Sequence, residues 1–338
     1  MKPEGIKTIL LAHGGGGRMT QDLVRSLFAA EFDNSILDRM DDSATFELEG
    51  RLAFTTDCHV VSPYFFPGGD IGRLALTGTV NDLAMTGAFP LYVAAGFIIE
   101  EGFPRESLGR IARSMQEAAA EARVQVVAGD TKVVERGAAD GIFITTSGLG
   151  LVPPGVNITG SAASPGDVVI LSGTVGDHGV AVMSRREGMR FETAIESDCA
   201  PLGELVRRML SASDRVRVLR DPTRGGLAAA LNEIAASSGV AIEIDEASLP
   251  LKPEVGAACE VLGLDPLTLA NEGKLVAMVD PEDAGRVLAA MKTSPMGAAA
   301  AVIGTVERAD RPRVYVRTAA GSRRALMMPS GEQLPRIC

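Results

Sequence analysis

The sequence contains no tryptophan, only three tyrosines and three histidines, and just four cysteines in 338 residues. These cysteines (Cys58, Cys199, Cys259 and Cys338) include no C-x-x-C pair, so the spacing of a zinc site is absent. Four cysteines are also too few for disulfides to act as the scaffold of a chain this long. This usage fits a reducing compartment, and we expect the protein to be cytoplasmic.

Long apolar runs and an excess of positive charge are also absent. No stretch approaches the ~20 apolar residues of a membrane span, and the start of the chain lacks the apolar core of a signal peptide. The formal net charge is -10. We therefore expect neither a membrane nor a nucleic acid as the main partner, whereas an anionic ligand held by a few local groups and a metal is allowed.

What is present is enough apolar sequence for a sizeable core, since 46% of the residues are hydrophobic. The length predicts two domains. Strand-like and helix-like segments alternate in both halves, which predicts two layered α/β (α+β) domains rather than a bundle or a sandwich. We expect an N-terminal helix and glycine-rich loop over 1–40, a first domain over 41–155, a second domain over 156–316 and a flexible tail over 317–338.

A run of four glycines, Gly14 to Gly17, precedes an apolar helical stripe near the start of the chain. A glycine loop that opens a helix can bind phosphate through its backbone N–H groups, so Gly14 and Gly16 are candidate phosphate contacts. The loop is not a Walker A motif, because no Gly-Lys-Ser/Thr follows it. The alternative is a flexible turn.

Acidic residues recur where we expect strands and helices to end. A strand is expected to end at Asp57, a helix capped by Asp70 to end near Asn81 and Asp82, and a strand over 124–132 to end in glycine, acid and lysine. The candidate metal ligands are Asp42, Asp57, Asp82, Asp130 and Asp221.

Hard oxygen ligands without histidine or cysteine suit Mg²⁺, which generally bridges protein carboxylates to nucleotide phosphates. Lys132 follows Asp130 by two residues and can supply a point charge to phosphate. The pattern predicts chemistry on ATP with Mg²⁺ but without a P-loop. The alternative is that the acids are ordinary turn and cap residues and that Lys132 is a solvated lysine.

The chain stops on Cys338, after a segment in which Pro329, Gly331 and Pro335 disfavour a helix. Nine residues beyond Pro329 span roughly 30 Å when stretched, so the tail can carry its thiol to a distant pocket. We predict that Cys338 is a substrate or carrier that a site elsewhere in the chain acts upon. The alternative is a chance cysteine on a disordered end.

Six motifs spread in order over essentially the whole chain resemble one family. They are His13–Gly17, Asn81-Asp82, Gly129–Val134, Asp221–Gly226, Asn271–Lys274 and the terminal Pro335–Cys338. In this combination they resemble the hydrogenase maturation factors of the HypE family, which belongs to the superfamily of aminoimidazole ribonucleotide synthetase and selenophosphate synthetase. The terminal tetrapeptide is the most specific of the six.

The resemblance implies an activity and partners. The Cys338 thiol would receive a carbamoyl group from the carbamoyltransferase HypF, and the protein would use ATP to dehydrate this thiocarboxamide to a thiocyanate. The cyano group would pass to iron on a HypC–HypD scaffold and become a ligand of the [NiFe]-hydrogenase centre. The first domains would pair into a shared β-barrel, which implies a homodimer. The expected nucleotide contacts are Gly14, Gly16, Asn81, Thr131, Arg224 and Asn271.

The chemistry itself demands a base. An amide-like oxygen is a poor leaving group, so it must be phosphorylated before phosphate can leave while the nitrogen loses its protons. Glu272 is our candidate base, and Lys132 is expected to offset charge on the phosphate or to adjust the base. The alternative for Glu272 is a turn residue paired with Lys274. Arg336 is expected either to pair with an acid or to be solvated.

Two rival functions use the same motifs. One is the synthesis of selenophosphate or of aminoimidazole ribonucleotide from free small molecules, but the glycine loop holds His13 where selenophosphate synthesis usually needs a reactive cysteine or selenocysteine. The other is a scaffold without catalysis that merely carries a modified tail, against which the acids and Lys132 argue. His13 and His178 lie beside glycines, and either can be a simple polar turn residue.

Overall fold

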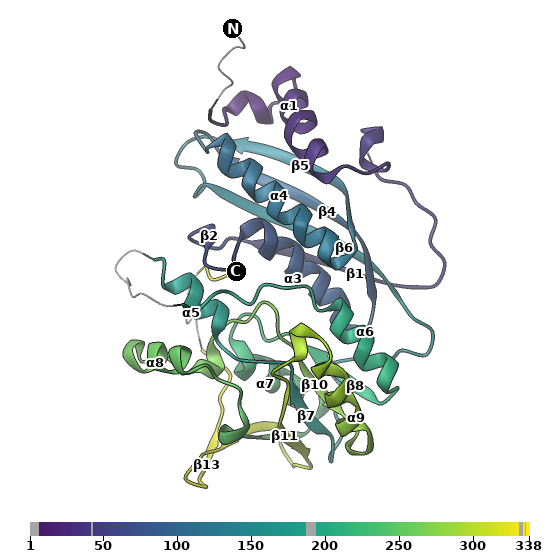
Figure 1. The fold of residues 1–338 in the computed structure, drawn as a ribbon, viewed down its shortest axis with the longest axis vertical. Helices are drawn as coiled ribbons and strands as arrows, with labels where there is room; N and C mark the ends of the chain where they lie inside the picture. Colours follow the sequence, from purple (N-terminus) through teal and green to yellow (C-terminus); the bar gives the residue numbers. More distant parts are fainter. Residues whose placement is uncertain (1–6, 42, 187–193, 331–333, 335) are drawn as a thin grey trace.

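The computed structural model describes residues 7–41, 43–186, 194–330, 334 and 336–338. They form two mixed α/β domains, the first above the second in Figure 1. The last residue of the chain lies between the two domains, near β2 and α5 (Figure 1). The prediction of two layered α/β domains is confirmed.

The first domain is built on a four-stranded sheet with the strand order β1-β6-β4-β5. Its strands are β1 (Arg51–His59), β4 (Phe89–Glu100), β5 (Gln125–Val134) and β6 (Ile142–Val152). β4 and β5 run parallel, and the other neighbouring pairs run antiparallel. In this strand order β1 and β5 are the two edge strands. A short ribbon of β2 (Phe65–Phe66) and β3 (Gly69–Asp70) leads into the first long helix.

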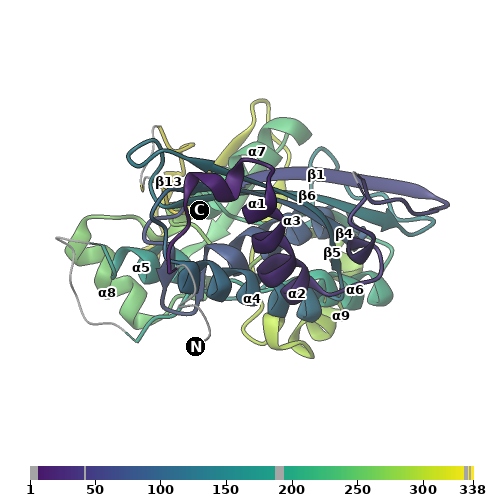
Figure 2. The ribbon, with the colours of Figure 1, turned by 90° about the horizontal axis from the view of Figure 1, so that it is seen from above.

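Helices cover one face of this sheet and leave the other face open. The helices α3 (Ile71–Met85) and α4 (Arg105–Ala122) lie on the same side of the strands (Figure 2). The N-terminal segments contact α4 and β5; they are η1 (Leu11–Gly14), α1 (Arg18–Leu23), η2 (Val24–Phe28), α2 (Ala29–Phe32) and η3 (Leu37–Arg39). Alternate residues of β1 point to the uncovered face, where Phe54 is 71% exposed.

The second domain is a seven-stranded mixed sheet in the order β13-β12-β9-β11-β7-β10-β8. The strands are β7 (Val168–Leu171), β8 (Val216–Arg220), β9 (Ala241–Asp245), β10 (Val276–Val279), β11 (Ala301–Glu307), β12 (Arg313–Arg317) and β13 (Arg323–Ala325). Helix α7 (Gly226–Ser238) packs on one face, and α6 (Gly203–Ala212) and α9 (Pro281–Lys292) pack on the other. Helices α5 (Asp177–Met183) and α8 (Pro253–Leu262) contact each other at one end.

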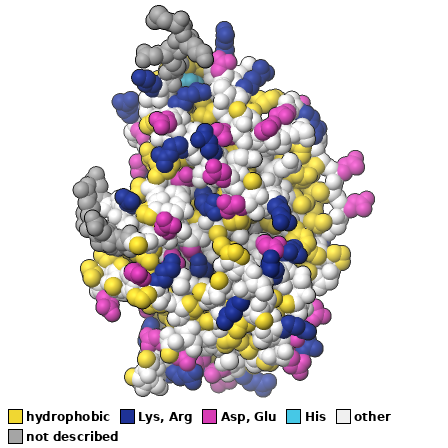
Figure 3. All heavy atoms as spheres, in the orientation of Figure 1, with side chains coloured by type: hydrophobic (Ala, Val, Ile, Leu, Met, Phe, Trp, Pro, Cys, Tyr) yellow, Lys and Arg dark blue, Asp and Glu magenta, His cyan; other side chains and the backbone are white. Residues whose placement is uncertain are grey.

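The surface of the described residues carries both signs of charge. Lysine and arginine side chains are interspersed with aspartate and glutamate side chains over the face in Figure 3. None of the helices in the described part of the chain is long and apolar enough to cross a membrane. All four cysteines are free thiols.

Several element boundaries differ from those predicted. The helix that Asp70 caps was expected to end near Asp82, but it continues to Met85 because residues 83–85 still pack in the core. Asp57 and Asp130 lie inside β1 and β5 rather than at strand ends. The cap at Asp70 is confirmed, because its side chain accepts the N–H groups of Gly72 and Arg73.

A flexible tail from residue 317 is not confirmed. Arg323–Ala325 form β13 against β12, and Leu326 is buried in the second core. At the end of the chain, Ile337 is 5% exposed and packs in the first core.

The side chain of Asn81 in α3 links the two domains. Its Nδ2 donates to the carbonyls of Ala200 (3.0 Å) and Glu272 (3.2 Å), and its Oδ1 accepts the N–H of Leu202 (2.7 Å). Asn81 is 1% exposed, so these groups have no water to replace a lost partner. The link holds the loop of Glu272 against the first domain.

We expect Asn81→Ala to lower the free energy of unfolding by about 2–4 kcal/mol, because three buried backbone groups lose their partner. Urea unfolding followed by circular dichroism measures the change. Thr86→Ala, at the end of the same helix, is the matched control, because it removes one local bond to Leu83. Its expected cost is below about 1 kcal/mol, and equal losses in both variants would contradict the role assigned to Asn81.

Candidate active site

The last residues of the chain lie along the loop that follows β1. The N–H of Val60 donates to the carbonyl of Cys338 (3.2 Å), and the N–H of Ser62 donates to the carbonyl of Arg336 (3.1 Å). The Nε of Arg336 donates back to the carbonyl of Val60 (2.9 Å). With Ile337 buried beside them, the end of the tail is fixed mainly through its backbone.

The second domain and one loop of the first hold the same residues from other sides. Nη2 of Arg186 donates to the carbonyl of Arg336 (2.8 Å), and Nε2 of His178 lies 2.8 Å from the carbonyl of Ile337. The guanidinium of Arg336 also pairs with Asp140, which confirms the predicted pairing with an acid. We call Val60, Ser62, His178 and Arg186 the tail-binding site.

This docking places the Cys338 thiol in a protected position. A cavity of about 360 Å³ lies beside it, with Arg224 and Ala270 in the lining. Arg224 lies near the thiol and favours its charged form. Burial, and then the charge of Glu272, raises the pKa of Cys338 from 9.0 to about 12. The docked cysteine is therefore a neutral thiol and a poor nucleophile at neutral pH.

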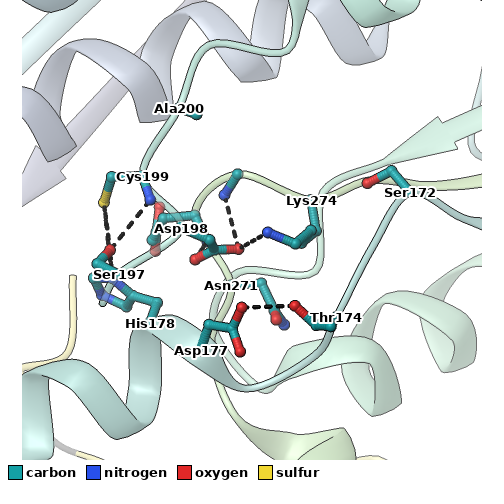
Figure 4. A network of polar contacts seen from close by, with 12 residues as sticks. Ser172, Thr174, Asp177, His178, Ser197, Asp198, Cys199, Ala200, Asn271 and Lys274 are labelled. Atoms are coloured by element: carbon teal, nitrogen blue, oxygen red, sulfur yellow. Dashed lines mark hydrogen bonds and ion pairs between the residues drawn. The ribbon is translucent and has the colours of Figure 1, made fainter. Parts of the chain in front are cut away.

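Glu272 is a buried carboxyl group close to this thiol. It is 4% exposed, and its Oε1 has no hydrogen-bond partner among the residues that the structure describes. Burial, and then the charges of Asp198 and Asp221, raises the pKa of Glu272 well above its ordinary value. The alternative that Glu272 pairs with Lys274 is wrong, because Nζ of Lys274 lies 3.0 Å from Oδ2 of Asp198 (Figure 4). Glu272 is thus a buried proton-binding group without an ion-pair partner in the described part of the chain.

Three of the five predicted metal ligands lie together. Burial and then the charge of Asp57 raises the pKa of Asp82, while burial and then Asp82 raises the pKa of Asp221 to about 7. Hydroxyl groups of Thr55 and Thr79 donate to Asp82 (3.0 Å) and Asp57 (2.9 Å). Such mutual repulsion indicates a place where a cation would be stabilising. Within the described residues, however, no three His, Cys, Asp or Glu side chains could hold a metal by themselves.

Of the other two predicted ligands, Asp130 is not in this cluster. Asp42 lies outside the described residues. Asp130 and Lys132 are exposed on β5, 3.3 Å apart, at the sheet edge opposite Asp57 on β1. Three strand spacings separate these edges, or about 14 Å. Thr131 lies between them with its side chain buried. One chain therefore brings together only part of the predicted site.

The glycine loop lies beside β5. A Cβ on Gly14 would come within 2.4 Å of the backbone nitrogen of Val133, so only glycine permits this close approach. Gly16 has a φ of +80°, and its N–H donates to Oγ1 of Thr20 (2.9 Å). The structure accounts for both glycines through the backbone, and their contact with phosphate stays a prediction.

Asn81 and Asn271 use their amides inside the protein. Nδ2 of Asn271 donates to the carbonyls of Pro222 and Leu269 (both 3.0 Å), and its Oδ1 accepts the N–H of Gly176 (2.8 Å). Both asparagines are at most 1% exposed. They thus position the loops that carry Arg224 and Glu272, while a direct contact with nucleotide stays a prediction for each.

The sequence reasoning missed several residues of the site. His178 was considered only as a possible turn residue, yet it lies in α5 and is fully buried. Asp198 lacks any motif, but it binds the loop of Glu272. His59 is 5% exposed, and its Nδ1 has no hydrogen-bond partner within the described part of the chain. Burial lowers the pKa of His59 to about 4. Only His59 had a signal: it follows Asp57 by two residues, and strand alternation puts both on one face.

Comparison with known proteins identifies the family. Residues 40–152 match the family "AIR synthase related protein, N-terminal domain", and residues 164–317 match the corresponding C-terminal domain. The chain is 55% identical over 341 residues to the carbamoyl dehydratase HypE of Cupriavidus necator, covering 100% of this chain and 97% of the relative. It is 46% identical to the carbamoyl dehydratase HypE of Escherichia coli, covering 98% of this chain and 100% of that protein.

Solved structures agree with these relatives. The crystal structure of hydrogenase maturation protein HypE in complex with ATP is 46% identical, covers 98% of this chain and 100% of its own, and superposes with a TM-score of 0.95. The HypE chain matched in a HypE–HypF complex is 50% identical over 91% of this chain and 99% of its own, with a TM-score of 0.80. The fold, the docked terminal cysteine and these matches together show that the chain belongs to the HypE family of carbamoyl dehydratases, within the AIR synthase related proteins.

Proposed function

We propose that this protein is an ATP-dependent dehydratase that acts in the cytoplasm on the S-carbamoyl group of its own Cys338. The product is a thiocyanate, which supplies the cyanide ligand of iron during [NiFe]-hydrogenase maturation. The observation that carries the proposal is the thiol of Cys338, docked beside Arg224 and Glu272 rather than exposed to solvent. Relatives named carbamoyl dehydratase support it.

The reaction breaks one C–O bond and removes two N–H protons. The carbamoyl oxygen takes the γ-phosphoryl group of ATP, ADP leaves, and inorganic phosphate then departs as the C≡N bond forms. Glu272 accepts a proton from nitrogen: its burial makes the carboxylate a stronger base than an exposed one, and Arg224 nearby favours the charged form. Its Oε1 has no other hydrogen-bond partner in the described structure.

The acids suit the phosphate end of the nucleotide. Asp57, Asp82 and Asp221 offer only hard oxygen ligands, and burial together with repulsion between the acids raises the pKa of Asp82 and of Asp221. We assign Mg²⁺ to these three residues, where it would offset charge on phosphate oxygens. With Mg²⁺ held by these acids, Arg224 and the backbone of the loop that carries Glu272 would orient the tail.

Asp130 and Lys132 require a second subunit to join this site. The uncovered sheet face carries exposed apolar side chains, among them Phe54, Leu52 and Ile98, and both sheet edges are unpaired. Such a face favours association, and two four-stranded sheets can close into an eight-stranded barrel without free edges. We propose a homodimer of this kind, in which Asp130 and Lys132 of one subunit complete the acid cluster of the other.

The partners follow from the thiol chemistry. A neutral, docked thiol is a poor acceptor, so carbamoylation requires the tail to leave the tail-binding site and enter a carbamoyltransferase. A relative 50% identical to this chain forms a HypE–HypF complex, and we propose a HypF-type transferase as the donor. We propose a HypC–HypD scaffold as the acceptor of the cyano group.

Cys338→Ala tests the carrier. The variant should bind ATP as the unchanged protein does, yet acquire neither the carbamoyl nor the cyano mass, because no other residue replaces the thiol. Intact-mass spectrometry after incubation with carbamoyl donor, transferase and ATP reads both modifications. Cys58→Ala, which removes an exposed thiol on the open sheet face, is the control. Carbamoylation of the Cys338→Ala protein would identify another carrier and overturn the proposal.

Glu272→Gln tests the base. A positioned base typically contributes ~10²–10⁴-fold, or about 3–5 kcal/mol of barrier, and glutamine keeps the shape but accepts no proton. We expect normal ATP affinity, normal carbamoylation and accumulation of the thiocarboxamide. Tandem mass spectrometry of the C-terminal peptide separates it from the thiocyanate by one water. Wild-type amounts of thiocyanate at early times would exclude Glu272 as the base.

Mixing two inactive variants tests the shared metal site. Asp82→Asn and Asp130→Asn should each sharply reduce Mg·ATP binding or turnover, measured by calorimetry and phosphate release. If each site takes Asp82 from one subunit and Asp130 from the other, equal mixing with subunit exchange should restore about a quarter of the activity, because half of the dimers then hold one intact site. Loss of activity without any restoration would place both residues in the same subunit's site.

A further inference from the structure

His178 lies between the docked tail and the loop that holds Glu272. Its ring is fully buried, with Nε2 2.8 Å from the carbonyl of Ile337 and Nδ1 2.8 Å from Oγ of Ser197. Figure 4 shows His178 and Ser197 side by side, with Cys199 and Asp198 beside them and Lys274 on the far side of Asp198. None of the chemical steps assigned above uses this histidine.

The two contacts fix the tautomer of the ring. A carbonyl oxygen only accepts, so the contact with Ile337 requires a proton on Nε2. Burial lowers the pKa of His178, and the neutral ring has only one N–H. Nδ1 is therefore an acceptor, and the hydroxyl of Ser197 (2.8 Å) and the thiol of Cys199 (3.7 Å) are both within reach of it. These neighbours are compatible with the tautomer in which His178 donates to the tail.

The segment that contains Ser197 also holds the base. Asp198 accepts the N–H of Glu272 (3.0 Å) and binds Lys274, and the carbonyl of Ala200 shares the amide of Asn81 with the carbonyl of Glu272. Residues 197–200 therefore connect the histidine that binds the tail with the loop that carries the carboxyl group.

We propose that His178 is a positioning residue of the dehydration: it binds the tail at the carbonyl of Ile337 and, through Ser197, keeps the thiol of Cys338 in register with Glu272. This inference rests on the proposed function for its catalytic consequence. Its structural part, the retention of the tail, is independent of any activity. The tail should therefore leave its site more often when the donor at position 178 is lost.

The reactivity of Cys338 reports tail release without an assay of turnover. Release returns the thiol from a pKa of about 12 toward 9.0, which raises the thiolate fraction at pH 8 by about a thousandfold. In His178→Ala the loss of one buried hydrogen bond should raise the alkylation rate of Cys338 about tenfold. The alkylation rate of Cys58, exposed on β1, serves as the internal reference and should not change.

Glutamine separates positioning from a general loss of structure. Its amide N–H can occupy the place of Nε2, so His178→Gln should restore slow alkylation of Cys338 and most of the dehydration rate. Ser184→Ala, in the turn after α5, is the matched control, because the Ser184 hydroxyl donates to the carbonyl of Ala181 (2.7 Å), within its own helix rather than to the tail. It should alkylate Cys338 at the unchanged rate.

The experiment uses full-length protein, first free and then carbamoylated, with peptide mass spectrometry at Cys338 and Cys58. Supporting results are faster Cys338 alkylation and about tenfold slower single-turnover dehydration in His178→Ala, both reversed in His178→Gln. An unchanged ratio of Cys338 to Cys58 alkylation in His178→Ala overturns the inference. Failure of the unchanged carbamoylated protein to yield thiocyanate with ATP would instead overturn the proposed function, and the alkylation ratios would still decide the retention of the tail.

Discussion

The carboxyl group of Glu272 and the thiol of Cys338 lie close together, shielded from solvent between the two domains. Many of the contacts described above hold them there. An unpaired buried carboxyl group is costly, and neither Glu272 nor Cys338 has an ion-pair partner among the described contacts that would offset this cost. Hydrogen bonds to the backbone around them offset this loss of folding free energy. Asp198 binds the loop of Glu272, and Asn81 links that loop to the first domain. Stability is thus sacrificed at the point where proton transfer is needed.

The first domain separates the two groups of nucleotide-binding candidates. The sheet places Asp57 at one edge and Asp130 at the other, with β6 and β4 between them. The same sheet leaves one face uncovered, which a single copy of the chain cannot bury. A dimer would resolve both features at once, because closing the open face brings the edge of one sheet toward the edge of another.

The sequence predicted what depends on local patterns. The cap at Asp70 and the alternation of strands and helices in both domains follow from hydrogen-bonding groups and periodicity near in sequence. The motifs also led to Cys338 and Glu272. The proximity of Asp82 to Asp221 and the role of His178 depend on segments more than a hundred residues apart. No periodicity carries that information, so tertiary contacts overrode the local signals of turn and cap.

The tail-binding site recognises the course of the backbone. The backbone oxygens of three consecutive residues, 336 to 338, are each bound. Apart from the Cys338 thiol, which lies near Arg224, the side chains of Arg336 and Ile337 add contacts of their own. Such contacts are the same whether the sulfur carries hydrogen, a carbamoyl group or a cyano group. Binding of the tail therefore does not distinguish a modified Cys338 from the free thiol. Only the few groups around the sulfur, chiefly the guanidinium of Arg224, can make this distinction. The tail that carries the cyano group therefore leaves the tail-binding site through the same contacts that the carbamoylated tail makes when it enters.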